Sequence, residues 1–88
     1  MSVRKRSRLQ IITNVLEVAS QPLGVGKTYI MFQANLSNEL MQEYLNFLVE
    51  KKLLDVWVKS ARRRLFKTND RGLEYIRKFR ELEVILGL

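Results

Sequence analysis

The side chains that most often catalyse reactions or hold metal ions are missing from this sequence of 88 residues. It contains no histidine and no cysteine. Their absence removes the commonest general base, the commonest zinc ligand and the thiolate nucleophile. It also excludes a disulfide-stapled scaffold. We therefore expect a binding protein rather than an enzyme, with no metal ion, cofactor or small-molecule ligand.

One glycine-rich stretch, Gly24-Val25-Gly26-Lys27-Thr28, ends like a phosphate-binding loop. The full motif needs an earlier glycine, and that position is occupied by Gln21. The motif also follows a strand, whereas a helical pattern precedes it here. We interpret the stretch as a loop that leads into a short helix.

The charge of the chain is concentrated in two segments. Sixteen Lys and Arg residues against nine Asp and Glu give a net charge of +7. Residues 1–8 carry four of the basic side chains, residues 59–71 carry six against one acid, and residues 9–58 are slightly acidic. A surplus confined to two segments predicts contact with a polyanion.

Hydrophobic periodicity predicts three helices in the first part of the chain. Helical spacing of apolar residues indicates a helix over residues 4–20, a loop at the Pro–Gly cluster 21–26 and a short helix over 27–33. After a turn at 34–36, Ser37 is a suitable N-cap for a helix that reaches about residue 52. Its expected buried stripe is Met41, Tyr44, Leu45 and Leu48.

The period then changes to that of a hairpin. Apolar residues alternate over 54–58, residues 59–62 form a polar tip, and residues 63–67 return as a second strand. Trp57 lies on the strand face opposite Val56 and Val58, where it could stack on a nucleic acid or pack within the domain. Thr68 is the expected N-cap of a last helix over 69–86.

This order of elements predicts a mainly α fold of the α+β type, a winged helix-turn-helix in which the hairpin is the wing. We expect a domain over residues 1–68, with residues 1–8 as a basic arm, and an added C-terminal dimerisation helix over 69–88. No apolar run is long enough to cross a bilayer. A cytoplasmic, nucleoid-associated protein with no membrane contact is expected.

Basic side chains on a wing and an arm are suited to reaching phosphates or a minor groove, so we expect double-stranded DNA as the partner. The expected outward face of the third helix consists of Glu39, Gln42, Glu43, Asn46 and Glu50. Phosphates would repel its three carboxylates. Only the start of that helix is therefore expected to touch DNA, with weak sequence preference. The expected DNA-binding residues are Arg4, Lys5, Arg6, Arg8, Lys27, Tyr29, Ser37, Asn38, Gln42, Arg62, Arg63, Arg64 and Lys67.

The last helix carries an apolar seam. Tyr75, Phe79, Leu82 and Leu86 are spaced as in a coiled coil, and the chain ends in an apolar run over residues 84–88. We expect these four residues to form a homodimer contact. The alternative is that one long helix closes the core of a monomer.

The sequence also resembles the archaeal winged-helix family that includes the 10a-type chromatin proteins. The likeness rests on residues 5–9, on the stretch KTYIMFQANLS over residues 27–37, on the pair Leu53-Leu54 and on residues 68–73. It implies double-stranded DNA binding with little sequence preference and dimerisation through an antiparallel coiled coil of the C-terminal helices. The final helix here is shorter than in the chromatin members, and the wing is longer and more basic.

Membership of that family does not by itself imply a chromatin role, because the family also contains proteins described as transcription regulators. A second kind of function stays open as well. The same scaffold could serve as a protein-interaction module that uses its basic wing and apolar C-terminus to hold a protein partner.

Overall fold

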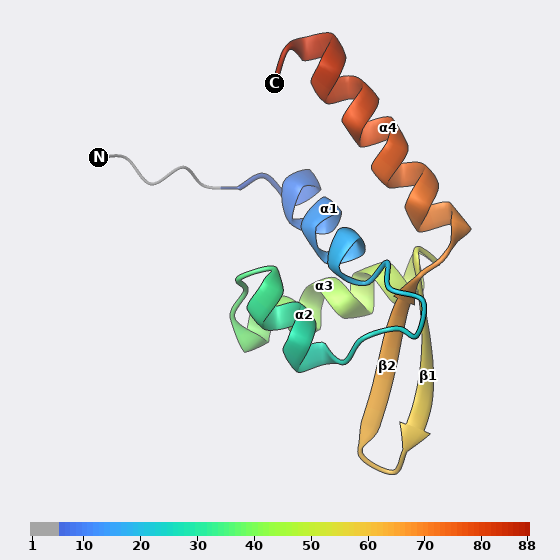
Figure 1. Cartoon of the computed structure of the whole chain (residues 1–88). Coiled ribbons are helices and arrows are strands. Elements are labelled where there is room, and N and C mark those ends of the chain that lie inside the picture. The colour runs from blue at the N-terminus through green and yellow to red at the C-terminus, as the bar shows by residue number, and fades with distance from the viewer. Residues whose placement is uncertain (1–5) are drawn as a thin grey trace.

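The computed structural model describes residues 6–88 as four helices and one antiparallel hairpin. Figure 1 shows the hairpin and the C-terminal half of the last helix projecting from the helical body in opposite directions. The predicted winged helix-turn-helix is confirmed. In chain order the elements are α1 (Arg8–Val18), α2 (Lys27–Gln33), α3 (Asn38–Glu50), β1 (Leu54–Ser60), β2 (Arg63–Thr68) and α4 (Asp70–Leu86).

The core forms where α3 packs against the other helices. All four residues of its predicted stripe are buried, with Met41 and Leu48 fully so. They pack with residues of α1 and α2 such as Leu16 and Ile30, which are also fully buried. Burial of the α3 stripe against these apolar residues of α1 and α2 holds the helix-turn-helix together. Ser37 caps α3 as predicted, its Oγ accepting from the backbone N–H of Leu40 at 3.2 Å.

The first helix is shorter than the predicted span of residues 4–20. Ser7 is its N-cap: the side chain of Ser7 accepts from the backbone N–H of Gln10 at 3.1 Å. The Gln10 side chain in turn accepts from the backbone N–H of Ser7 at 2.7 Å. This reciprocal capping box sets the helix start at Arg8, because a capping residue adopts an extended backbone. Arg4 and Lys5 lie outside the described residues.

The junction between the wing and α4 corrects a second prediction. Asn69, and not Thr68, caps α4, since the Asn69 side chain accepts from the backbone N–H of Gly72 at 3.0 Å. Thr68 is buried, and its hydroxyl donates instead to the carbonyl oxygen of Leu16 at 2.6 Å. The Asn69 amide also donates to the carbonyl oxygen of Lys52 at 2.9 Å. Asn69 thus connects the segment after α3, the wing and α4 through hydrogen bonds.

The base of the hairpin is tied to the loop before α2. Val25 and Phe66 exchange two backbone hydrogen bonds of 2.9 and 2.8 Å, so the loop adds a single bridge beside β2. Gly24 has a φ of +76°, and the ring of Trp57 lies so close that a Cβ there would come within 2.7 Å of it. One edge of the Trp57 ring therefore packs against the loop before α2, while the residue remains 40% exposed.

The first half of α4 packs on α1. The Tyr75 hydroxyl donates to the carbonyl oxygen of Leu9 at 2.8 Å and lies 3.0 Å from the hydroxyl of Thr13. Burial raises the pKa of Tyr75 above its usual value, and the contact with Thr13 opposes this more weakly. Arg80 forms ion pairs with Glu17 of α1 and with Glu83, and these raise its pKa. These contacts fix the direction in which α4 leaves the domain.

Candidate nucleic-acid interface

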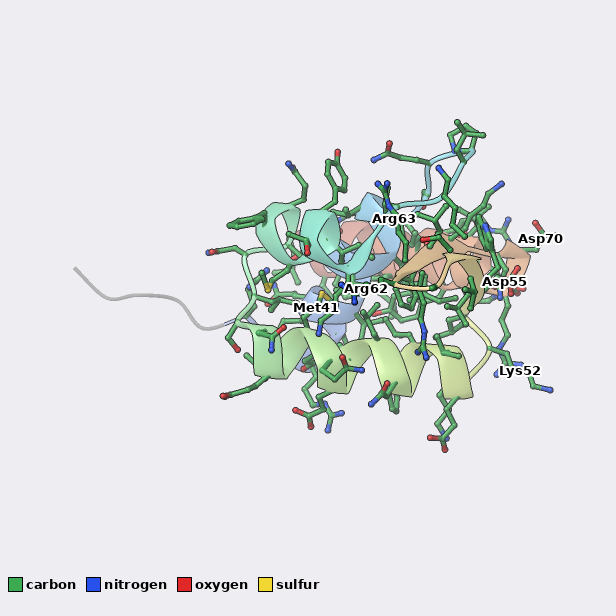
Figure 2. The ribbon with its side chains drawn as sticks, turned by 90° about the horizontal axis from the view of Figure 1, so that it is seen from below. Met41, Lys52, Asp55, Arg62, Arg63 and Asp70 are labelled. Atoms are coloured by element: carbon green, nitrogen blue, oxygen red, sulfur yellow. The ribbon has the colours of Figure 1, made fainter. Side chains whose placement is uncertain are left out.

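An open groove of about 850 Å³ lies between the start of α2, one face of α3 and the wing. Seen from below in Figure 2, Arg62 and Arg63 lie on the side of the wing toward α2 and α3, while Asp55 and Asp70 lie on the other side. The groove therefore has a basic rim supplied by the wing tip. Its lining residues are Gly26–Tyr29, Gln42, Leu45, Asn46, Val49, Glu50, Val56, Val58, Ser60–Arg64 and Phe66.

The face that α3 turns toward the groove is largely neutral. It consists of Gln42, Leu45, Asn46 and Val49, which recur at helical spacing. Glu39 and Glu43 are exposed but do not line the groove, so only Glu50 brings a carboxylate to it. From the sequence, Gln42 and Asn46 were expected on the same outward face as Glu39 and Glu43. In the structure Gln42 and Asn46 face the groove, whereas Glu39 and Glu43 lie on a different face of α3.

That difference changes which part of α3 faces the groove. Ser37 and Asn38, expected to touch DNA from the start of α3, are exposed but lie outside the groove lining. Gln42 lies inside it, together with Asn46, which was not among the expected site residues. Lys27 and Tyr29 of α2 also line the groove, as their place in the sequence suggested.

The wing presents different side chains on its two faces. Val56 and Val58 line the groove, and Arg64 lies directly across the hairpin from Val58. Lys67 pairs with Asp55 in the strand register and is absent from the groove lining, so it lies on the other face. Three of the four expected wing residues, Arg62, Arg63 and Arg64, therefore share the groove. The exposed valines were missed because strand alternation alone assigns them to a core.

The two described basic residues of the arm contact the domain itself. The guanidinium of Arg6 donates to the carbonyl oxygens of Ala34 and Asn35 at 2.6 and 2.9 Å, and to the Asn14 side chain at 3.0 Å. It thus satisfies carbonyls at the end of α2, where a cation is favourable. Arg8 lies over the rings of Tyr44 and Phe47, 5.9 and 5.8 Å from their centroids.

Replacing Arg6 should therefore affect stability more than the salt dependence of binding. We expect Arg6→Ala to lower the free energy of unfolding by about 1–2 kcal/mol, because three hydrogen bonds of a charged donor are lost. Urea denaturation of the variant measures this change. Arg77→Ala removes the same charge from an exposed position of α4 and should leave stability nearly unchanged; equal effects of the two substitutions would refute the capping role.

The expected dimer residues divide into two groups. Tyr75 is bonded to α1, and Phe79 is half-buried with its ring stacked on that of Tyr75 at a centroid distance of 6.1 Å. Leu82 and Leu86 are 53% and 67% exposed. They belong to an exposed apolar group, here called the apolar end of α4, that also includes Val84, Ile85 and, just beyond the helix, Leu88.

Within residues 6–88 no three His, Cys, Asp or Glu side chains gather closely enough to hold a metal ion. None of the helices described there has the length and apolar character needed to cross a membrane.

A helix-turn-helix followed by a hairpin wing, with a basic groove between them, defines the class of winged helix-turn-helix proteins. The chain belongs to the winged helix-turn-helix family, whose model matches residues 5–86. This match confirms the family predicted from the sequence.

Solved structures with a similar fold include a DNA-binding protein and a transcription regulator, the latter also in complex with DNA. Sso10a-2, a DNA-binding protein from Sulfolobus solfataricus, matches with a TM-score of 0.79 and 19% identity over 93% of this chain and 83% of its own. MepR, a transcription regulator of the Staphylococcus aureus multidrug efflux pump MepA, matches with a TM-score of 0.73 and 20% identity. That match covers 92% of this chain and 60% of MepR.

A complex of S. aureus MepR with DNA matches with a TM-score of 0.72 and 19% identity, covering 92% of this chain and 67% of that one. At such identities the likeness establishes the shared fold. No curated protein sequence matches the chain.

Proposed function

We propose that this protein binds double-stranded DNA with weak sequence preference, as a chromatin-associated or transcription-regulatory protein of the nucleoid, and that it carries out no catalysis. The observation that carries the proposal is the groove, in which Lys27, Arg62, Arg63 and Arg64 face a neutral row of α3. An α-helix fits the major groove of a duplex. A wing beside that helix then lies next to the adjoining phosphate backbone and minor groove.

The charge arrangement supports a backbone-dominated interaction. Four cations reach the groove and one carboxylate, Glu50, opposes them. Contacts of Arg and Lys with phosphates supply affinity that does not depend on base sequence. The similar structures support the same proposal, since Sso10a-2 is a DNA-binding protein and MepR is solved with DNA.

A duplex titration followed by fluorescence anisotropy tests the proposal. We expect binding to unrelated sequences of about 20 base pairs, with log affinity falling against log salt at a slope of at least about −3.5, since four groove cations each displace counterions. Failure to bind any duplex at micromolar protein and about 0.15 M salt would contradict the proposal and favour the protein-interaction module.

The homodimer belongs to the same proposal and rests on the apolar end of α4. Figure 1 shows the last turns of α4 extending beyond α1, where no other element covers them. Exposed apolar side chains in a continuous group usually mark a contact surface. Tyr75 is hydrogen-bonded to α1. Of the four residues expected at the dimer contact, Phe79, Leu82 and Leu86 therefore remain available to a second copy.

Charge inserted into this seam should dissociate the dimer. We expect wild-type protein to behave in light scattering as a particle of twice the 10.4 kDa chain mass, and Leu82→Glu/Leu86→Glu to behave as a single chain. The control Leu23→Glu/Leu40→Glu adds the same charge at two exposed leucines outside the apolar end of α4 and should leave the dimer in place. A wild-type particle of single-chain mass at high concentration would rule out the dimer.

A further inference from the structure

Three polar side chains form one hydrogen-bonded row along the groove. The Nζ of Lys27 donates to the Oε1 of Gln42 at 2.9 Å, and the Nε2 of Gln42 donates to the Oδ1 of Asn46 at 3.0 Å. All three residues line the groove. Gln42 and Asn46 lie one turn apart on α3, and Lys27 begins α2. The row therefore runs along the part of α3 that would face a major groove.

The direction of the hydrogen bonds in this row is set at one end by Lys27. An ammonium group can only donate, so Gln42 must turn its carboxamide oxygen toward Lys27. The Gln42 nitrogen is then turned toward Asn46, which must accept with its own oxygen. Because the Asn46 oxygen is already engaged by Gln42, the NH₂ of Asn46 is the polar group of this side chain that has no partner within the row. Both ends of the row consequently present donors.

Resting on the duplex binding proposed above, we propose that Asn46 is a specificity-determining residue that donates to the N7 and O6 atoms of a guanine. On the major-groove edge only guanine shows two adjacent acceptors. Adenine pairs its N7 acceptor with an N6 donor, thymine shows one acceptor beside a methyl group, and cytosine shows a donor. An amide whose oxygen is engaged by Gln42 and whose NH₂ is free therefore matches guanine best.

This readout concerns one base pair for each chain and leaves the backbone contacts of the wing unchanged. Arg62, Arg63 and Arg64 come from the wing and supply affinity to any duplex. The Asn46 amide adds a preference at one position. A protein built in this way prefers some sequences modestly while still binding all of them.

Selection from a randomised duplex library, followed by affinity measurements on single duplexes, tests the proposal. We expect an enriched guanine at one position, whose replacement by another base weakens binding about fivefold to tenfold. Replacing that guanine by 7-deazaguanine, which lacks the N7 acceptor, should weaken binding several-fold. Inosine keeps N7 and O6 and loses only the minor-groove amine, so it should bind like guanine.

Two variants test the role of the row. Asn46→Leu should abolish the guanine preference and leave the salt slope unchanged, because it removes no charge. Lys27→Glu places an acceptor at the head of the row, which reverses both carboxamides and presents the Asn46 oxygen; the preference should move from guanine to a base with a major-groove donor. Gln33→Leu, at an exposed position of α2 outside the groove lining, is the matched control and should keep the guanine preference.

The outcomes separate this inference from the proposed function. Duplex binding with no enriched base, or a guanine preference that survives in Asn46→Leu or in Lys27→Glu, overturns the readout and leaves duplex binding standing. Absence of binding to any library member overturns both. A guanine preference that is lost with 7-deazaguanine and moves to a donor-bearing base in Lys27→Glu supports the assignment.

Discussion

The double substitution Arg63→Ala/Arg64→Ala is expected to flatten the dependence of log affinity on log salt by about two units. Both side chains line the groove from the wing, and each should displace about one counterion from the duplex when it contacts a phosphate. Affinity at about 0.1 M salt should fall on the order of 30-fold, to a similar extent for unrelated sequences. Anisotropy titrations at several salt concentrations measure both quantities.

The matched control for the wing variant removes the same charge elsewhere. Arg71 and Arg77 lie on exposed positions of α4 outside the groove lining, so Arg71→Ala/Arg77→Ala also lowers the net charge by two. If the groove holds the duplex, the control should change the salt slope much less than the wing variant does. Equal changes would mean that net charge, and not the wing, determines affinity.

The substitution Gly72→Ala is expected to destabilise the fold by about 1–3 kcal/mol. A Cβ on Gly72 would come within 2.5 Å of the carbonyl oxygen of Leu53 and 2.6 Å of the Thr68 side chain. A backbone carbonyl cannot move aside as the end of a flexible side chain can, so α4 must shift against the wing. Gly72 is also the residue whose N–H the Asn69 cap holds. The urea midpoint of the variant reports the loss.

Gly26→Ala provides the comparison within the same chain. A Cβ on Gly26 would meet nothing within 4 Å, and its φ of −82° suits any residue. Gly26 is the N-cap of α2, where alanine is less favourable than glycine, while alanine also restricts the unfolded chain. These two effects oppose each other, so we expect stability to change by less than about 1 kcal/mol. Loss of stability in Gly26→Ala of the size expected for Gly72→Ala would show that crowding is not the cause.

Sequence patterns predicted the helix-turn-helix well because neighbouring residues determine where its helices begin and which face they bury. The range of α2 and the cap and buried stripe of α3 follow from residues within a few turns of one another. The choice between Thr68 and Asn69 as the cap of α4 does not follow from nearby residues. It depends on the carbonyl of Leu16, to which the buried Thr68 hydroxyl donates from 52 residues away. The two neighbours are both good caps, and only the packed structure separates them.

The groove depends even more on contacts between residues that are far apart in the sequence. Sequence placed the basic residues on a wing, but which face of the wing each occupies depends on how the hairpin crosses α3. That crossing puts Arg64 and Val58 in the groove and Lys67 outside it. It also separates Gln42 and Asn46 from Glu39 and Glu43 on one helix. Arg6 was likewise predicted to contact DNA. In the structure its guanidinium donates to the carbonyl oxygen of Ala34 at the end of α2, 28 residues away, and the sequence gives no sign of this contact.

The most direct test of the central claim is a map of where a duplex touches the protein. A titration of ¹⁵N-labelled protein with a short duplex, followed by backbone amide shifts, provides that map for a chain of 10.4 kDa. We predict that the largest shifts fall on residues 26–29, 42–50 and 58–64, and that residues 80–88 change little. Large shifts confined to residues 80–88, with the groove unaffected, would contradict the assignment of the groove as the DNA-binding surface.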